Sequence, residues 1–193
     1  MASLVRWGHR TEVVEVSVEG TAIGGLYVVR HPTHEDGRGF FRQTFQHSEL
    51  TEAIGRSPSF VQGNHSRSPA GVLRGFHAEP WDKLVYVARG TAFCAVVDIR
   101  ATSPTCGEVA TFLLGDPPGE RVRLFVSVGL ANAFCAVTDV DYLYDVSAEW
   151  RPSVNKRSVA WDDEDLAVEW PVADPVVSPE DRANPTLAEL LGR

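Results

Sequence analysis

The stretch "KLVYVARGTAFCAVVDIR", residues 83–100, decides the fold class of this chain. Valine, other apolar residues and aromatic residues dominate it, and Arg89-Gly90 interrupts it near the middle. The stretch therefore predicts two β-strands that turn at this dipeptide.

Similar runs recur about every ten residues, with Gly, Pro, Asp and Ser between them. They cover residues 12–20, 25–31, 108–116, 121–129 and 133–150. Many short strands at such spacing predict an antiparallel all-β sandwich or barrel.

Helix signals are few. Residues 47–55, "HSELTEAIG", predict one helix with Ser48 as a possible N-cap and Gly55 as its stop. Residues 184–193, "NPTLAELLGR", predict a last helix that begins near Asn184 or Thr186. The acidic, proline-containing residues 162–181 are expected to wrap irregularly around the core. We expect one domain over residues 1–193, with a barrel core at about 20–150 and a C-terminal wrap and short helix over 151–193.

The bulk composition excludes several classes of protein. The formal net charge of −8 opposes non-specific binding of nucleic acid. Three cysteines, at positions 94, 106 and 135, match no zinc or redox spacing and predict reduced thiols. The sequence has neither the apolar core of a signal peptide nor a run of about 20 apolar residues that would span a membrane. We therefore expect a cytoplasmic protein.

The stretch from Gly71 to Gly90 holds the histidine on which the functional interpretation depends. Its pattern, G-x5-H-x-E-x3-K-x6-G, resembles the first metal-binding motif of cupins, which has three ligands. His77 keeps the first ligand position, but Glu79 and Lys83 stand in place of the other two ligands. Asn132 likewise replaces the histidine of the second cupin motif in "SVGLAN". A lysine and an asparagine are poor ligands for a transition metal, so a metal site is disfavoured.

Taken by itself, His77 is either an ordinary histidine at the end of a strand or a general base. In a regular strand His77 and Arg74 would face opposite sides, and a bend at Gly75 would bring them together. "DGRG" at residues 36–39 predicts a turn, whose arginine is either solvated or bound to a phosphate.

Two other segments place polar groups on one strand face. Residues 62, 64, 66 and 68, in "QGNHSRS", alternate and form a polar row, which is either solvated or reads a ring or a base edge. Tyr142 and Tyr144 also share a face, and a phenol there is either a core filler or a proton donor.

Eight ordered motifs carry a resemblance to a known family: "DGRGFFRQTF", "QGNHSRSPAGVLRGFH", "KLVYVARG", "VVDIRATSPTCGE", "GLANAF", "YDVSAEWRP", "WDDEDLAVEWP" and "SPEDRANP". Together they run from about residue 18 to 191. The chain resembles the nucleotide-sugar epimerases typified by dTDP-4-dehydrorhamnose 3,5-epimerase. The resemblance implies a cofactor-free, cupin-type jelly-roll β-barrel, a homodimer, and an NDP-4-keto-6-deoxyhexose substrate inverted at C3, at C5 or at both.

The resemblance also implies roles for residues at matching positions. His77 matches the general base, Asp181 the carboxylate that orients it, Lys83 the cation that stabilises the enolate, and Tyr144 the acid that returns a proton from the opposite face. The residues that match positions binding the nucleotide, the diphosphate or the sugar are Arg38, Phe41, Gln43, Gln62, Asn64, Arg74, Asn132 and Trp150.

The chain departs from the family pattern at three places. Asn132 stands for the usual histidine, Gln43 stands for the usual glutamate, and the loop over residues 78–82 is shorter than usual. These differences leave open which sugar is used and which carbon is inverted. The alternatives are a sugar-nucleotide ketoisomerase of the cupin type, or a sugar-nucleotide-binding cupin without activity.

Overall fold

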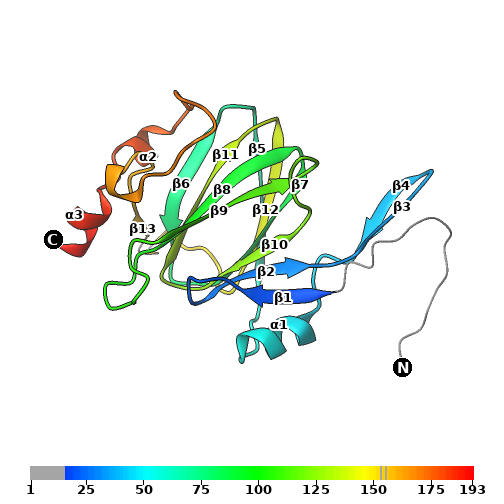
Figure 1. Cartoon of the computed structure of the whole chain (residues 1–193). Coiled ribbons are helices and arrows are strands. Elements are labelled where there is room, and N and C mark those ends of the chain that lie inside the picture. The colour runs from blue at the N-terminus through cyan, green and yellow to red at the C-terminus, as the bar shows by residue number, and fades with distance from the viewer. Residues whose placement is uncertain (1–15, 153, 155) are drawn as a thin grey trace.

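Two antiparallel sheets packed face to face make up the body of the molecule, in a computed structural model that describes residues 16–152, 154 and 156–193. The six-stranded sheet has the order β1-β2-β10-β7-β12-β5, and the five-stranded sheet has the order β13-β6-β11-β8-β9 (Figure 1). This arrangement confirms the predicted all-β, jelly-roll class.

The bounds of the elements follow from the hydrogen-bonding pattern. The strands of the larger sheet are β1 (Ser17–Gly20), β2 (Leu26–Arg30), β5 (Gln62–Ser68), β7 (Lys83–Arg89), β10 (Arg123–Val126) and β12 (Val140–Val146). Those of the smaller sheet are β6 (Leu73–Ala78), β8 (Thr91–Asp98), β9 (Val109–Gly115), β11 (Leu130–Ala136) and β13 (Arg157–Ser158). The remaining elements are a hairpin of β3 (Thr33–Asp36) and β4 (Gly39–Arg42), the helices α1 (His47–Ile54), α2 (Pro179–Arg182) and α3 (Leu187–Leu191), and the 3-10 turn η1 (Glu164–Leu166).

The turn between β7 and β8 shows how the chain builds two sheets from one run of sequence. The two strands meet at Gly90, as predicted, but each belongs to a different sheet. Gly90 has a φ of +79°, and a Cβ there would lie 2.0 Å from the carbonyl oxygen of Asp139. Only glycine fits this crossing. The main core lies between the sheets and includes Val85, Val87, Val96, Leu124 and Phe134.

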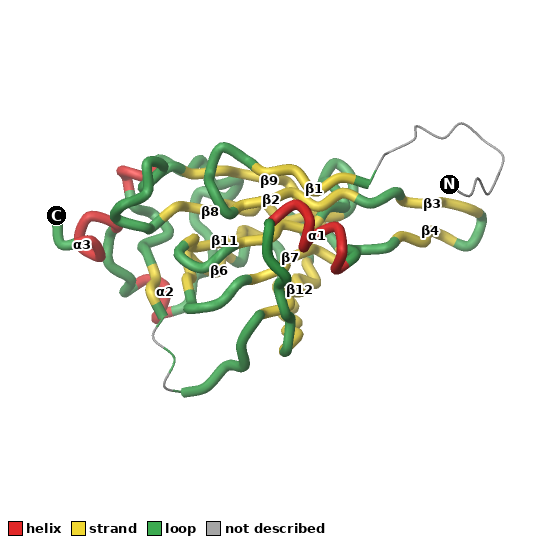
Figure 2. The backbone as a smooth tube through the Cα atoms, turned by 90° about the horizontal axis from the view of Figure 1, so that it is seen from below, coloured by secondary structure: helices red, strands yellow, loops and turns green. Residues whose placement is uncertain are grey.

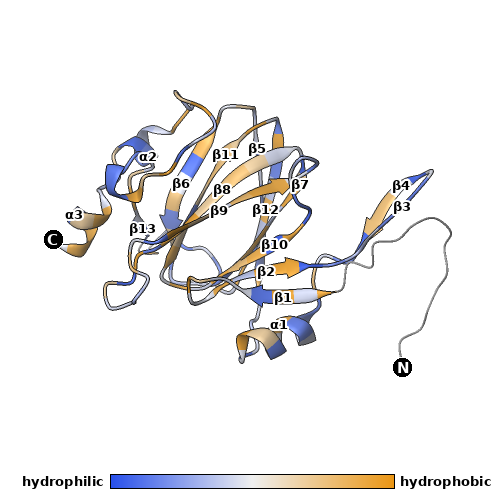
Figure 3. Cartoon of the chain, viewed as in Figure 1, coloured by the Kyte–Doolittle hydropathy of each residue, from blue (hydrophilic) through white to orange (hydrophobic). Residues whose placement is uncertain are grey.

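The β3–β4 hairpin projects from one end of the barrel (Figures 1 and 2). It confirms the turn predicted at residues 36–39. Its second strand is hydrophobic (Figure 3), yet Phe40 and Phe41 are 48% and 70% exposed. A projecting strand with two exposed phenylalanines is typical of a surface that another molecule covers.

The C-terminal wrap is anchored by two tryptophans. The Trp170 indole nitrogen donates to the carbonyl oxygen of Trp161 at 2.9 Å, and its ring packs against Phe76 and Phe93. The prediction of an irregular segment over residues 162–181 holds except for η1 and α2, which are too short to leave a periodic signal.

The structure confirms the two longer predicted helices, but the N-cap of one of them differs from the prediction. Helix α1 ends at Gly55, whose φ is +74°, as predicted. Its N-cap is Gln46 and not Ser48, because the chain turns helical one residue before the serine. Helix α3 begins after Thr186, whose side chain forms a reciprocal capping box with Glu189.

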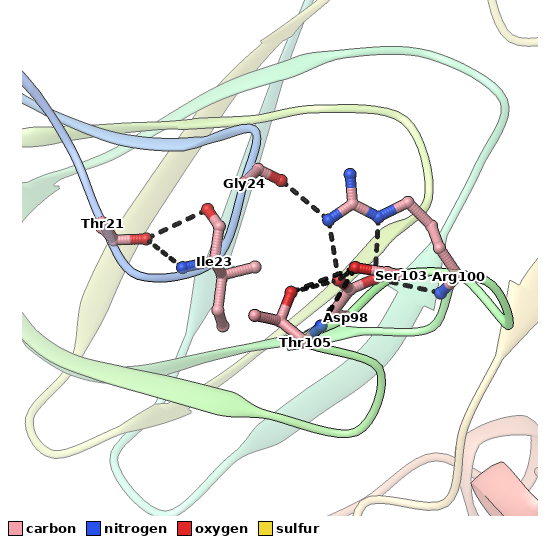
Figure 4. A network of polar contacts seen from close by, with 7 residues as sticks. All are labelled: Thr21, Ile23, Gly24, Asp98, Arg100, Ser103 and Thr105. Carbon is pink, nitrogen blue, oxygen red and sulfur yellow. Dashed lines mark hydrogen bonds and ion pairs between the residues drawn. The ribbon is translucent and has the colours of Figure 1, made fainter.

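A buried carboxylate fixes the loop after β8 (Figure 4). Asp98 is fully buried, and it accepts hydrogen bonds from Arg100, Ser103 and Thr105 at 2.5 to 3.0 Å. Arg100 also donates to the carbonyl oxygen of Gly24, so the network ties this loop to the β1–β2 turn.

The first strand of the six-stranded sheet is β1. The strand expected over residues 12–20 appears as β1 from Ser17, and residues 12–15 lie outside the described part of the chain.

Among the described helices, none is long and apolar enough to cross a membrane.

Candidate active site

A pocket of about 160 Å³ opens between the two sheets. Five of the predicted site residues line it, together with four that the sequence did not assign to a role. The lining consists of Ser66, Arg74, His77, Glu79, Lys83, Asn132, Phe134, Tyr142 and Tyr144.

An irregularity in β6 brings Arg74 and His77 to the same side. His77 pairs with Asn132 and Arg74 pairs with Phe134, so three steps along β6 match two steps along β11. At this place Gly75 has a φ of +123°, and a Cβ there would lie 2.5 Å from the Cβ of Ala133. The bend considered from the sequence is therefore present, and it is a β-bulge with room for glycine alone.

His77 and Asp181 form a close pair although 104 residues separate them. His77 Nε2 lies 2.6 Å from Asp181 Oδ1, and Asp181 Oδ2 accepts from the backbone N–H of Gly75 at 3.3 Å. Burial alone would raise the pKa of Asp181, but the contacts with His77, Gly75 and Ser178 outweigh it and lower the pKa below 3.8. Asp181 is thus a carboxylate that holds the proton of Nε2 and leaves Nδ1 as the basic ring nitrogen.

Lys83 lies at the start of β7 and is 4% exposed. Its ammonium donates to Asn132 Oδ1 at 2.6 Å and to the carbonyl oxygen of His77 at 3.1 Å. Glu79 Oε2 forms an ion pair with it at 2.5 Å. Burial lowers the pKa of Lys83, and the negative charge of Glu79 opposes that effect.

Two tyrosines of β12 occupy the opposite wall. Tyr142 is buried and stacks on Phe134, with ring centroids 4.2 Å apart. Tyr144 is more exposed, and its ring centroid lies 6.2 Å from that of Tyr142. Burial raises the pKa of both phenols, and the charge of Glu79 raises that of Tyr144 further. Both hydroxyls are therefore protonated at neutral pH and able to donate.

A polar row leads from the pocket along β5. Ser66, Asn64 and Gln62 pair with Tyr142, Tyr144 and Val146 of β12 in turn. Gln62 Nε2 donates to Asn64 Oδ1 at 2.7 Å, and Gln62 Oε1 accepts from the backbone N–H of Trp150 at 2.8 Å.

Arg38, Phe41 and Gln43 are not brought to the pocket of this chain. Arg38 sits at the tip of the β3–β4 hairpin, where its side chain is 88% exposed and pairs with Asp36 at 2.5 Å. Phe41 lies on the same hairpin, and Gln43 directly follows it. The hairpin points away from the barrel (Figure 2), so a single chain does not assemble all the positions expected to bind substrate.

Of the four unassigned lining residues, only Glu79 carries a charge. The sequence pattern presents Glu79 only at a replaced metal-ligand position, and its place in the pocket depends on how the short loop over residues 79–82 turns. Tyr142 shares a strand face with Tyr144 in the sequence, and this alternation is a signal that points to the pocket. Within the described residues, no three His, Cys, Asp or Glu side chains converge as a metal site.

A second hollow, of about 450 Å³, lies outside the barrel beside β8 and β9. It is lined by residues of β8 and β9 and by the segment from Leu166 to Glu169, and Glu169 is the one titratable side chain in this lining. The chemistry therefore points to the pocket between the sheets.

Comparisons with known proteins agree with this geometry. The sequence model of the dTDP-4-dehydrorhamnose 3,5-epimerase family matches residues 20–189. The dTDP-4-dehydrorhamnose 3,5-epimerase of Methanothermobacter thermautotrophicus is 35% identical over 169 residues, covering 84% of this chain and 89% of that one. The dTDP-4-dehydrorhamnose 3-epimerase of Streptomyces niveus is 34% identical over 171 residues, covering 86% and 82%.

A solved structure agrees as well. The dTDP-6-deoxy-D-glucose-3,5-epimerase of Legionella pneumophila, in complex with dTDP-4-keto-L-rhamnose, superposes with a TM-score of 0.82 at 33% identity, covering 92% of this chain and 97% of that one. By sequence over most of its length and by fold, the chain belongs to the dTDP-4-dehydrorhamnose 3,5-epimerase family.

Proposed function

We propose that this protein inverts C3, C5 or both in a dTDP-linked 4-keto-6-deoxyhexose, as a step of deoxysugar biosynthesis. One observation carries the proposal. His77 projects from the five-stranded sheet and Tyr144 from the six-stranded sheet, and both line one pocket. A base and an acid on opposite walls are what inversion of a carbon centre requires, because the proton leaves one face and returns to the other.

The chemistry starts from the ketone at C4, which acidifies the hydrogens on C3 and C5. Nδ1 of His77 accepts the proton, and Asp181 stabilises the imidazolium that forms. The electron pair moves onto the C4 oxygen and gives an enolate, which the buried ammonium of Lys83 stabilises. Tyr144 then donates its phenolic proton to carbon from the other face. Solvent returns a proton to the phenolate and takes up the proton of the His77 imidazolium, which restores both groups for the next turnover.

The nucleotide end of the substrate needs positive charge and a flat surface. Arg74 lines the pocket and donates to Ser68 at 3.0 Å, which leaves the other guanidinium nitrogens for a phosphate. Gln62 and Asn64 extend from the pocket toward Trp150. Trp150 is 52% exposed and offers a ring on which the nucleobase can stack.

We also propose that the working unit is a homodimer, in which the hairpin of one chain completes the pocket of the other. Phe40 and Phe41 are exposed on that hairpin, and its Arg38 pairs only within the hairpin in the described residues. The whole chain then acts as one domain in the cytoplasm, with Arg38, Phe41 and Gln43 supplied across the interface.

A mixing experiment tests the shared site. His77→Ala and Arg38→Ala/Phe41→Ala variants are each inactive, or nearly so, when alone. Dissociation and reassociation of the mixture gives hybrids that have one intact pocket facing one intact hairpin, so we expect about a quarter of the wild-type activity. Activity no higher than the sum of the two variants would contradict a shared site.

The reaction is tested by solvent deuterium. The protein is incubated in heavy water with dTDP-4-keto-6-deoxyglucose, and NMR follows deuterium at C3 and C5. Incorporation at one carbon or at both supports the epimerase and shows which carbon is used. A ketoisomerase would move the carbonyl group, which the same spectra would report. Binding without incorporation, for dTDP-linked and other NDP-linked sugars, would leave a non-catalytic sugar-nucleotide-binding protein.

A further inference from the structure

Glu79 is a carboxylate inside the pocket for which the reaction above has no use. It directly follows β6, and its side chain is 13% exposed. Its Oε2 lies 2.5 Å from the Lys83 ammonium. Among the described residues this oxygen is buried and has no hydrogen-bond donor apart from that contact. A buried carboxylate is costly unless a cation compensates it, so Glu79 depends on Lys83.

The loop that carries Glu79 is held firmly in place. Trp81 and Asp82 are 6% and 4% exposed. The Asp82 carboxylate forms an ion pair with Arg56 at 2.6 Å and accepts from the backbone N–H of Val128 at 3.2 Å. The backbone N–H of Asp82 donates to Ser147 at 2.9 Å. The short loop therefore fixes the position of Glu79 before any ligand arrives.

Lys83, in turn, has one anion in contact with it. Its other two close contacts, Asn132 Oδ1 and the carbonyl oxygen of His77, are neutral oxygens. Lys156 is a second cation nearby, and it disfavours the charge on Lys83. The other charged and titratable groups around this part of the pocket are Arg74 and His77 on β6, Tyr142 and Tyr144 on β12, and Asp181 of α2, which is bound to His77.

We propose that Glu79 is a positioning residue, which acts through Lys83 by holding its ammonium as a cation beside His77. Desolvation drives a buried lysine toward its neutral form, and the carboxylate at 2.5 Å opposes that tendency. A neutral amine would neither attract the enolate nor keep three oxygens around it. The catalytic consequence rests on the proposed epimerase function, whereas the effect on Lys83 does not.

The direct test is a titration of Lys83 without substrate. The protein is labelled with 15N-lysine, the Lys83 signal is assigned with a Lys83→Arg variant, and its pKa is followed in wild type and in Glu79→Gln. We expect Lys83 to lose its proton at a lower pH in Glu79→Gln and to stay near the wild-type value in Glu79→Asp. Glu49→Gln removes a carboxylate outside the pocket and serves as the matched control, which should leave Lys83 unchanged. If Glu79→Gln does not fold, Glu79→Ala supplies the neutral side chain without added bulk.

A second measurement reads the consequence for catalysis. Tyr144→Phe removes the phenol, whose pKa Glu79 also raises, so deuterium exchange in that background reports His77 and Lys83 alone. There, Glu79→Gln should move the alkaline fall of the exchange rate to lower pH and reduce the rate above that point about tenfold or more. An unchanged Lys83 titration in Glu79→Gln would overturn the proposal whether or not any sugar is turned over. A wild-type protein that exchanges no NDP-4-keto sugar would refute only the epimerase function.

Discussion

Replacing Asp181 with asparagine tests the base most directly, because it changes one atom and reverses a hydrogen bond. Asp181 accepts from His77 Nε2 at 2.6 Å and from the backbone N–H of Gly75 at 3.3 Å. An asparagine that keeps the Gly75 contact through its oxygen presents its NH₂ group to His77. Nε2 must then accept, the ring proton moves to Nδ1, and the nitrogen that faces the substrate is no longer a base.

The expected size of the effect follows from the lost charge pair. A carboxylate about 4 Å from an imidazolium contributes about 4 kcal/mol at an effective dielectric constant near 20. The His77 side chain is 34% exposed, and solvent there reduces this to about 2–4 kcal/mol. At about 1.4 kcal/mol for each factor of ten, kcat should fall about 30- to 1000-fold. KM should change little, because the asparagine touches His77 and not the nucleotide.

The assay is deuterium incorporation at C3 and C5 under saturating substrate, with rates taken from the first turnovers. Asp163→Asn is the matched control, because Asp163 is a buried carboxylate of the same C-terminal wrap that accepts from the backbone N–H of Leu187 at 2.7 Å, away from the pocket. If Asp181→Asn stayed within about threefold of the wild-type kcat, the reasoning about the charge pair would be wrong.

Three further predictions concern acid catalysis, backbone geometry and acid stability. Tyr144→Phe should keep deuterium exchange at the abstraction site while epimer formation, read by NMR, drops at least about tenfold; full inversion would refute the acid role. Gly75→Ala should lower the free energy of unfolding in urea by about 3 kcal/mol, since its Cβ would lie 2.5 Å from that of Ala133; a neutral result would contradict the bulge. Asp98→Asn should cost about 2–3 kcal/mol at pH 7. Burial alone would raise the Asp98 pKa, but hydrogen bonds from Arg100, Ser103 and Thr105 lower it below 3.8, so the Asp98 contribution is present above that pH and lost as the pH falls below it. Melting curves of the wild type and the variant should therefore converge in acid, and a constant difference would rule this out.

The strands and the two longer helices were predictable because their signals are local. Turn residues separate the strands, and Gly55 and Thr186 end and begin their helices with recognisable caps. The sheet to which each strand belongs was not predictable from such signals. Residues 83–100 look like a hairpin, but β7 pairs with β10 and β12 and β8 pairs with β9 and β11, so the chain crosses between sheets at Gly90.

Only part of the candidate site could be predicted, because its residues come together through contacts between distant segments and not through local signals. Arg74 and His77 have odd spacing, so regular alternation would have separated them, and the bulge at Gly75 appears only in the pairing with β11. Asp181 lies 104 residues from His77, and the residues alone gave no reason to join them; the family resemblance did. The sequence presents Glu79 only as a lost metal ligand, because it does not show which way the four-residue loop turns.

The surroundings of Lys83 determine how a ketone oxygen can arrive there. Three protein oxygens lie within 3.1 Å of the ammonium, as many as it has N–H groups. An incoming ketone oxygen therefore has to take the place of one of these three oxygens. Asn132 is a neighbour that can give way by rotation of its amide. The rotation breaks its contacts with the Lys83 ammonium and the Tyr142 hydroxyl, and it lets the amide NH₂ and the Lys83 ammonium donate to the same ketone oxygen. At this position the chain therefore has an amide whose contacts with Lys83 and Tyr142 can be exchanged for a contact with the arriving ketone oxygen.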